Sequence, residues 1–383
     1  MILIINSGSS SLKFRIFSDE LRQLGGGIIE RLKLPRSFLD FQIGSETGHR
    51  TFARGLHDHV DALQEIFTIL TETGLNLSEI QAVGHRVVHG GEKFIRPTLV
   101  TKQTLMQLHH YDQLAPLHNP ENLAGIAAAL ELLPQAKQVA VFDTAFHATL
   151  PDYAYRYALP RRLYEKFGVR KYGFHGISHR FVSEEAAKKL KKPLSKINLI
   201  TCHLGSGSSI CAVQAGQSID TSMGLTPLQG LIMSTRCGDI DPAIPLFMVD
   251  QLGRSIDEVY GLLNNESGLI GLTGHADLRD LLVILGEKIP GFTPRKRPNK
   301  EEYERARLAV DKLCYDVVRY IGAYTALLGR VDAIVFTAGI GERSAVIRRR
   351  IMSRLKLNPK PRVLVVPTNE ELEIAREIKS LLG

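Results

Sequence analysis

Two stretches of this chain, about two hundred residues apart, share one design: a strand, a turn rich in glycine and serine, and a second strand. In the first, Met1–Ile5 is a short apolar strand, Asn6–Ser11 is the turn, and Leu12–Phe17 alternates apolar and polar residues. The second, Leu199–Val213, has its turn at His203–Ser209 (HLGSGSS). Phosphate loops of the P-loop and dinucleotide-binding kinds run from a strand into a helix, whereas both of these turns run from strand into strand. The repeat predicts a duplicated domain, although a single hairpin of this composition is also a common turn.

The composition of the two turns indicates what they bind. Small residues let backbone N–H groups and hydroxyls come close to a phosphate chain, and Lys13 adds positive charge beside the first turn. We therefore expect both turns to hold phosphate and to face each other across a cleft.

The rest of the chain alternates between apolar runs typical of strands and longer segments with helical spacing, which predicts an α/β protein. Asn119 and Pro120 predict a helix start, with the asparagine as N-cap and the proline in the first turn. The further predicted strands are Gln81–Val83, Lys137–Phe142, Ile197–Cys202, Ser209–Val213, Asp332–Phe336 and Arg362–Val366. The predicted helices are Asp58–Thr71, Leu123–Leu133, Ser178–Leu190, Ser255–Leu263, Lys300–Leu328 and Asn369–Leu382.

The composition argues against several classes of partner. With 383 residues, 44% of them apolar and 23% charged, the chain is expected to be a soluble protein of two domains. Its net charge of +8 comes from basic residues interleaved with acidic ones, which favours an anionic small molecule over nucleic acid. The four cysteines lack metal-site spacing, and there is neither a signal-like leader nor an apolar run of ~18 residues. We expect a reduced, cytoplasmic protein that does not bind membranes.

Nine motifs, in order along the whole chain, resemble the acetate kinase family within the acetate and sugar kinase, Hsp70 and actin superfamily. They are Asn6–Lys13, His85–Glu92, Leu114–Pro120, Val141–His147, Tyr172–His179, His203–Ser209, Asp220–Asp241, Phe336–Glu342 and Thr368–Glu371. The resemblance implies an α/β fold of duplicated ribonuclease-H-like (actin-like ATPase) domains with an active-site cleft between them. It implies an N-terminal domain of residues 1–147 plus 372–383, and a C-terminal domain of residues 148–371 for nucleotide binding and dimerisation.

The resemblance also implies the reaction: reversible phosphoryl transfer from ATP to acetate by direct in-line attack, giving acetyl phosphate and ADP. The family works with Mg²⁺, for which Mn²⁺ is an alternative, and usually as a homodimer. A carboxylate attacking a phosphate faces repulsion of roughly 4 kcal/mol between unit charges at ~4 Å in a medium of effective dielectric near 20. The acetate is already ionised at neutral pH, so the protein has to position and neutralise charge rather than supply a base.

Arginine suits this task because its planar fork binds carboxylate and phosphate oxygens with two parallel bonds. Arg86 and Arg236 match the family's two catalytic arginines. The alternative for Arg86 is a surface salt bridge, which its position beside apolar Val87 and Val88 disfavours. His175 matches the family histidine that stabilises the transferring phosphoryl group. His118 matches a supporting histidine, although a structural role is as plausible for it. His85 and His89 lack a metal-site glutamate, so we do not expect zinc there.

The remaining site residues come from the resemblance alone. Asp143 is expected to be catalytic and, with Glu370, to hold Mg²⁺, and Asn6 is a further metal ligand; read alone, the two acids are ordinary turn or helix-start carboxylates. The acetate pocket consists of Arg86, Val88, Leu117, Phe174 and Pro227. The nucleotide-binding residues are Lys13, His203, Leu204, Gly205, Ser206, Gly207, Asp277, Leu278, Arg279, Ala338, Gly339, Ile340 and Gly341. The small Ala338–Gly339 pair leaves room for a purine, which favours ATP over a donor without a base.

Four positions depart from the family pattern. Ser206 stands where the family has asparagine, Gln229 where it has glutamate, Cys237 where it has serine, and Arg343 where it has asparagine. The stretch after Thr273 is one residue shorter than usual. The alternatives are a propionate or butyrate kinase on the same scaffold and a nucleotide-binding regulator that has lost turnover; an actin- or Hsp70-like assembly protein leaves the carboxylate pocket unexplained. The basic run at 294–300 is expected to be a solvated loop without assigned function.

Overall fold

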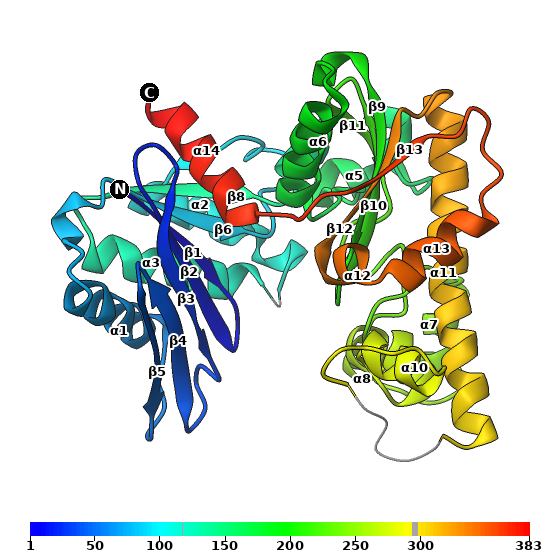
Figure 1. Ribbon diagram of the computed structural model, residues 1–383, viewed down its shortest axis with the longest axis horizontal. Coiled ribbons are helices and arrows are strands. Elements are labelled where there is room, and N and C mark those ends of the chain that lie inside the picture. Colours follow the sequence, from blue (N-terminus) through cyan, green and yellow to red (C-terminus); the bar gives the residue numbers. More distant parts are fainter. Residues whose placement is uncertain (117, 293–297) are drawn as a thin grey trace. The chain divides into compact units, whose positions relative to one another are not determined.

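The computed structural model describes residues 1–116, 118–292 and 298–383, and the chain forms two compact units, each built on its own β-sheet (Figure 1). The first unit comprises Met1–Ala148 and Asn369–Gly383, and the second comprises Thr149–Thr368. Leu117 and most of the basic run at 294–300 lie outside the described residues.

The described residues of the first unit form an eight-stranded sheet in the order β5-β4-β3-β2-β1-β6-β8-β7. The strands are β1 (Ile2–Ser7), β2 (Ser11–Phe17), β3 (Gln23–Glu30), β4 (Ser37–Ile43), β5 (Glu46–Phe52), β6 (Ala82–Val87), β7 (Thr98–Leu99) and β8 (Lys137–Phe142). β1 to β5 are antiparallel neighbours, whereas β1, β6 and β8 run parallel. The carboxyl ends of β1, β6 and β8 therefore share one edge of this sheet, which we call the carboxyl edge.

The first unit contains α1 (His59–Glu72), α2 (Lys102–Leu108), α3 (Asn119–Leu132) and α14 (Glu370–Leu382). α1 begins where the Asp58 side chain accepts hydrogen bonds from the N–H groups of Val60 and Asp61, and its apolar side packs into the core over the sheet. α14, the red helix of Figure 1, returns to this sheet from the far end of the sequence and packs on β1 and β6.

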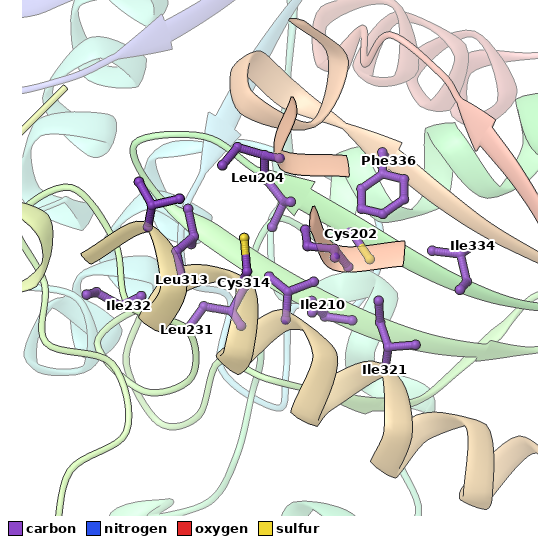
Figure 2. Close-up of a cluster of buried hydrophobic side chains, with 14 of the residues drawn as sticks. Cys202, Leu204, Ile210, Leu231, Ile232, Leu313, Cys314, Ile321, Ile334 and Phe336 are labelled. Atoms are coloured by element: carbon purple, nitrogen blue, oxygen red, sulfur yellow. The ribbon is translucent and has the colours of Figure 1, made fainter. Parts of the chain in front are cut away.

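The described residues of the second unit form a five-stranded sheet in the order β11-β10-β9-β12-β13. Its strands are β9 (Asn198–Leu204), β10 (Ser208–Gln214), β11 (Gln217–Thr221), β12 (Ala333–Thr337) and β13 (Arg362–Val365). Its helices are α4 (Asp152–Tyr155), α5 (Arg161–Phe167), α6 (Gly176–Leu190), α7 (Ala243–Asp250), α8 (Ile256–Asn265), α9 (Gly268–Thr273), α10 (Leu278–Ile284), α11 (Lys300–Leu328), α12 (Ala338–Arg343) and α13 (Ala345–Arg354). The long α11 begins with a capping box at Asn299 and Glu302. Figure 2 shows how its apolar side, including Leu313 and Ile321, packs against sheet residues such as Ile210 and Phe336.

The two sheets repeat one topology, as the paired hairpins predict. In the first, β3-β2-β1-β6-β8 contains two antiparallel pairings followed by two parallel ones, and β11-β10-β9-β12-β13 in the second has the same order and the same directions. The predicted duplicated α/β architecture is confirmed.

Two local predictions are wrong in detail. The first turn is shorter than Asn6–Ser11, because Asn6 pairs with Lys13 within the β1–β2 ladder and Gly8 N–H donates to the Ser11 carbonyl. Asn119 is not the N-cap of α3: its side-chain amide accepts from His89 N–H and donates to the His89 carbonyl, both at 3.0 Å. A buried backbone segment that needs both a donor and an acceptor takes the amide away from the helix end.

Candidate functional site

Three charged side chains meet at the carboxyl edge of the first unit. Arg86 lies on β6 and Asp143 directly follows β8, so parallel neighbouring strands present them at the same edge. Arg86 Nε donates to Asp143 Oδ1 at 3.1 Å and its Nη2 donates to Oδ2, a two-bond fork. Glu370, the first residue of α14, places Oε2 3.6 Å from Arg86 Nε. Arg86 is thus an ion-paired residue with 20% of its side chain exposed, and not a solvated surface arginine.

The local electrostatics favour charge on all three groups. Burial alone would lower the pKa of Arg86, but the carboxylates of Asp143 and Glu370 outweigh it and hold the pKa of the guanidinium above its ordinary value. Asp143, whose side chain is 2% exposed, keeps its place through two bonds to one cation.

The other predicted residues of the first unit come from several elements: β1, β2, the end of β6 and the start of α3. Asn6 and Lys13 are opposite each other in the β1–β2 ladder, so their side chains share one face of the sheet. Val88 is 7% exposed, and its N–H donates to Asn122 Oδ1 at 3.0 Å. Asn122 Nδ2 in turn donates to the Ser7 carbonyl at 2.5 Å, which ties the ends of β1 and β6 together. His118 stands at the N-terminal end of α3, where its side chain makes no capping bond.

In the second unit, a cluster of histidines lies between α6 and β9. His175 Nδ1 is 2.9 Å from Ser209 Oγ, and the His175 ring stacks on His203 with centroids 4.2 Å apart. His203 Nδ1 is 2.8 Å from Ser178 Oγ. The backbone of His175 is left-handed, with φ of 56°, an uncommon conformation for a residue with a side chain and one often found at functional sites.

Arg236 lies beside the same cluster. A Cβ placed on Gly207 would be 3.3 Å from His175 Nε2 and 3.9 Å from Arg236 Nη1, so the turn between β9 and β10 brings these two side chains together. Arg236 Nη1 donates to the Pro227 carbonyl at 3.3 Å, and its guanidinium has no carboxylate partner among the residues that the structure describes. Burial lowers the pKa of Arg236. A half-buried cation with neutral neighbours is suited to receive an anion.

The β9–β10 turn also approaches α12. A Cβ on Gly205 would lie 3.6 Å from Ala338 Cβ, and one on Gly341 would lie 3.5 Å from the Cys202 carbonyl. Ala338 has a left-handed backbone, with φ of 61°, and Gly339 faces open space. Leu204 is fully buried and Ile340 packs on the core, so their side chains are structural here and leave backbone groups for a ligand.

The segment Asp277–Arg279, unlike the glycine turn between β9 and β10, forms the start of a helix, α10. Asp277 caps α10 by accepting from Arg279 N–H at 2.8 Å, and its carboxylate also pairs with the Arg279 guanidinium, which lowers the pKa of Asp277. Leu278 is 5% exposed and belongs to the core of this unit. Phe174 is 1% exposed and Pro227 is half-buried. Of the predicted nucleotide-binding residues, Asp277 therefore caps α10, and Leu278 packs in the core of the second unit.

The four departures from the family pattern lie in distinct surroundings. Ser206 is exposed at the turn, and its carbonyl accepts from Ser234 N–H at 3.2 Å. Gln229 Oε1 accepts from the Tyr157 hydroxyl at 2.7 Å, and Cys237 Sγ donates to the Gly238 carbonyl at 3.2 Å. Arg343 is exposed. Ser206 alone among them directly borders the turn glycines.

Sequence reasoning missed the residues that hold the predicted ones in place. Ser209 Oγ lies within 2.9 Å of His175 Nδ1 and 2.8 Å of His179 Nε2, while His179 Nδ1 is 2.7 Å from Thr201 Oγ1. Asn122 has the same kind of role in the first unit. The signal was present, since Ser209 closes the second hairpin motif, but nothing in a sequence states which side chains face one another.

A duplicated α/β fold that holds an unpaired arginine beside a glycine turn is suited to a kinase, that is, a phosphotransferase. The Acetokinase family model matches residues 1–360, and the chain belongs to that family. It is 46% identical to the acetate kinase of Halothermothrix orenii, over 98% of each chain, and 46% identical to that of Clostridium novyi, over 100% of this chain and 98% of the relative. A propionate kinase structure from Francisella tularensis matches with a TM-score of 0.89 and 38% identity over 98% of each chain. The Porphyromonas gingivalis acetate kinase matches with a TM-score of 0.88 and 37% identity, over 100% of this chain and 99% of that one. The predicted family is confirmed.

Two features are absent from the part of the chain that the structure describes. No helix there is both long enough and apolar enough to cross a membrane. Nor do three or more His, Cys, Asp or Glu side chains gather there in a group that could hold a metal ion.

Proposed function

We propose that this protein catalyses reversible phosphoryl transfer from ATP to acetate, giving acetyl phosphate and ADP. The observation that carries the proposal is Arg236: a half-buried guanidinium next to His175 and the glycine turn, with no carboxylate partner among the described residues. Such a cation is suited to the charge that develops on a transferring phosphoryl group. Arg86 would act on the same substrates from the first unit.

Each group has a defined task in the proposed reaction. The acetate carboxylate attacks the γ-phosphorus directly, so a bond forms between a carboxylate oxygen and phosphorus while the bond to the ADP oxygen breaks. Arg236 neutralises charge on the phosphoryl oxygens. His175 donates to them from Nε2 in the tautomer whose Nδ1 accepts from the Ser209 hydroxyl, 2.9 Å away. No proton has to be removed from acetate, which accounts for the absence of a general base from this scheme.

Mg²⁺ is part of the proposal, and the residues at the carboxyl edge fit it. Asp143 and Glu370 present carboxylate oxygens next to Arg86, and Asn6 lies near the end of the neighbouring strand β1. These are oxygen donors of the kind that Mg²⁺ takes, together with several waters. When bound, the ion would neutralise charge on the phosphate oxygens of the nucleotide. Asp143 and Arg86 would meanwhile keep each other aligned through their two-bond fork.

The direct test is a panel of short carboxylates with ATP, GTP and pyrophosphate, in which acyl phosphate is trapped as a hydroxamate. We expect acetyl phosphate from acetate and ATP, dependent on Mg²⁺. No acyl phosphate with any acid, alongside measurable ATP binding, would contradict the proposal and favour a regulator without turnover.

Propionate is the second candidate substrate, because a propionate kinase is among the similar solved structures. Acetate and propionate differ by one methylene, which is worth only ~1–3 kcal/mol in an apolar pocket. The ratio of kcat/KM for the two acids in the same panel separates the readings. A ratio above about tenfold in favour of propionate would overturn acetate as the preferred substrate.

We further propose that the protein is cytoplasmic.

We also propose that a second copy of the chain covers α7. None of the side chains of this apolar helix is buried, and Leu246 and Phe247 are 70% and 55% exposed. Leu252 and Ile256, at 58% and 77%, continue the apolar surface toward α8. Exposed apolar area of this extent marks an interface. Light scattering should show a dimer that Leu246→Asp dissociates and Phe167→Asp, a matched exposed position on α5, does not; a wild-type monomer would refute this.

A further inference from the structure

The polar face of the first sheet carries a hollow whose lining, apart from Lys13, has no part in the proposed reaction. Its volume is about 720 Å³, and its lining comes from β2, β3, β4 and β5 and the connections between them. This volume is in the range of small-molecule sites. The hollow lies on the side of these strands opposite to the hydrophobic core, whose residues include Phe14 and Ile43.

The strand register places a defined set of polar side chains on this face. Arg15 is opposite Gly26, Gly26 is opposite Gln42, and Gln42 is opposite Thr47. Because directly opposed residues of antiparallel strands project to the same side, Arg15, Gln42 and Thr47 form one row across four strands. Lys13 lies two residues before Arg15, on the same face and in the lining of the hollow.

Glycines shape both sides of β3 at this point. A Cβ on Gly26 would lie 2.6 Å from Arg15 Cδ and Nη1, so the arginine side chain lies directly over this residue. On the core side, a Cβ on Gly25 would collide with Ile43 and one on Gly27 with the Phe14 ring. Gly25 and Gly27 therefore leave space for large core side chains, and Gly26 leaves space for the Arg15 side chain on the opposite face.

The cations of the hollow lack acidic partners. Neither Lys13 nor Arg15 makes an ion pair with a carboxylate among the described residues, and Arg15 Nη1 donates only to the Phe14 carbonyl at 3.1 Å. The one acid in the lining, Asp40, has its Oδ1 2.6 Å from His49 Nδ1. Most of the Arg15 fork thus remains for an oxyanion, next to amide and hydroxyl groups that can bind hydroxyls.

We propose that this hollow binds a small phosphorylated molecule, with its phosphate held by Arg15 beside Lys13 and its hydroxyl groups directed toward Gln42 and Thr47. The ligand is a sugar phosphate or a molecule of the same chemistry. Apart from Lys13, which belongs to both sets, the residues of this site differ from the predicted nucleotide-binding residues. Its existence does not depend on the proposed reaction.

Calorimetric titration of the full chain tests the site with inorganic phosphate, glucose 6-phosphate and glucose as probes. Arg15→Gln should weaken phosphate binding about tenfold or more, the effect of losing a hydrogen-bonded charge. Gln42→Glu should weaken it through repulsion. Arg54→Gln, which removes the same charge from an exposed position outside the hollow, should bind as the wild type does. Glucose 6-phosphate should bind more tightly than phosphate, and glucose not measurably.

Several outcomes would overturn the site. Phosphate binding that Arg15→Gln leaves unchanged would do so, as would one-for-one displacement of phosphate by saturating MgATP, which would place the anion in the nucleotide site. Equal affinity for phosphate and glucose 6-phosphate would remove the assignment of hydroxyl groups to Gln42 and Thr47. Circular dichroism of each variant shows whether it is folded. Because the titrations need no turnover, they hold even for a chain without kinase activity.

Discussion

The two units present arginine in opposite states. Arg86 in the first unit is held by Asp143 in a two-bond fork and approached by Glu370. Arg236 in the second unit instead donates to the Pro227 carbonyl and the Met233 sulfur. The pKa of Arg86 is raised by its carboxylates against the effect of burial, and the pKa of Arg236 is lowered by burial. Two residues with the same chemistry and the same proposed substrates thus differ in what their own unit provides.

This difference shows that the two copies of a duplicated fold can give the same side chain different electrostatic surroundings. A saturated arginine is fixed in position and brings little net positive charge, so Arg86 is suited to orient a substrate and its metal. An unsaturated arginine costs the folded protein some stability and offers its full charge to a ligand. The two halves therefore have one topology but different electrostatics, and the following variants test that contrast.

The largest effect is expected for Arg236→Leu. Removing the unpaired cation should lower kcat by ~10³-fold or more, as loss of a transition-state arginine does in phosphoryl transfer. The free energy of unfolding should not fall, since no ion pair is lost. Arg349→Leu, an exposed arginine on α13, serves as the matched control and should keep its rate in the same coupled assay. Near-normal turnover of Arg236→Leu would remove this residue from the mechanism.

Asp143→Ala should show the opposite balance, with a clear loss of stability. Breaking a buried ion pair leaves Arg86 without its main partner and should lower the free energy of unfolding by about 3 kcal/mol. The double variant Arg86→Leu, Asp143→Leu should recover much of that loss, because no charge is left unpaired. Urea unfolding curves measure both. If the single and double variants are equally stable, the loss does not come from the unpaired charge on Arg86; if Asp143→Ala is as stable as the wild type, the fork does not stabilise the first unit.

His85 of the first unit is a buried histidine whose proton binding makes the stability of the protein depend on pH. His85, on β6, is 2% exposed with its Nε2 2.8 Å from Gln138 Oε1, and burial lowers the pKa of His85 to about 4. Between that value and the ordinary 6.5, the unfolded chain binds more protons than the folded one, so stability falls as the pH drops through this range. The loss should approach about 3 kcal/mol between pH 7 and pH 4. His85→Gln should lack this part of the pH dependence in urea unfolding; parallel curves for the two proteins would show that His85 is not the group involved.

The smallest effect is expected for Ser209→Ala in the second unit. Its hydroxyl lies within hydrogen-bond distance of both His175 and His179, and losing those bonds should lower kcat about tenfold while KM for acetate and ATP stays the same. Ser183→Ala is the matched control, because that buried hydroxyl donates only to the helix carbonyl of His179. A rise in KM without a change in kcat would mean that Ser209 shapes binding rather than the orientation of His175.

The sequence predicted the parts of the fold in which local pattern and tertiary role agree. The two hairpins, β8 and the long α11 have periodicities that match their burial, and their predicted bounds agree closely with the structure. The strands β3 and β5 escaped prediction because glycine and polar residues are poor strand formers. Their identity as strands comes from neighbours: Phe14 and Phe41 occupy the space that Gly27 and Gly48 leave on the core side.

For the site, sequence motifs supplied the residue types but not their pairing. Arg86, Asp143 and Glu370 are far apart in the chain, and only the parallel strands and the return of α14 bring them together. The same holds for Asn119, whose side chain serves His89 rather than its own helix. Hydrogen-bond partners are decided by tertiary packing, and a single sequence carries little record of them.

The last helix has a consequence for how this protein is made. Because α14 belongs to the first unit, a ribosome that has already released β1 to β8 has not yet produced Glu370 or the apolar residues that close that sheet. All residues of the second unit are synthesised before the last residues of the first unit, Asn369–Gly383. Arg86 and Asp143 therefore meet Glu370 only after every residue of the second unit has been synthesised.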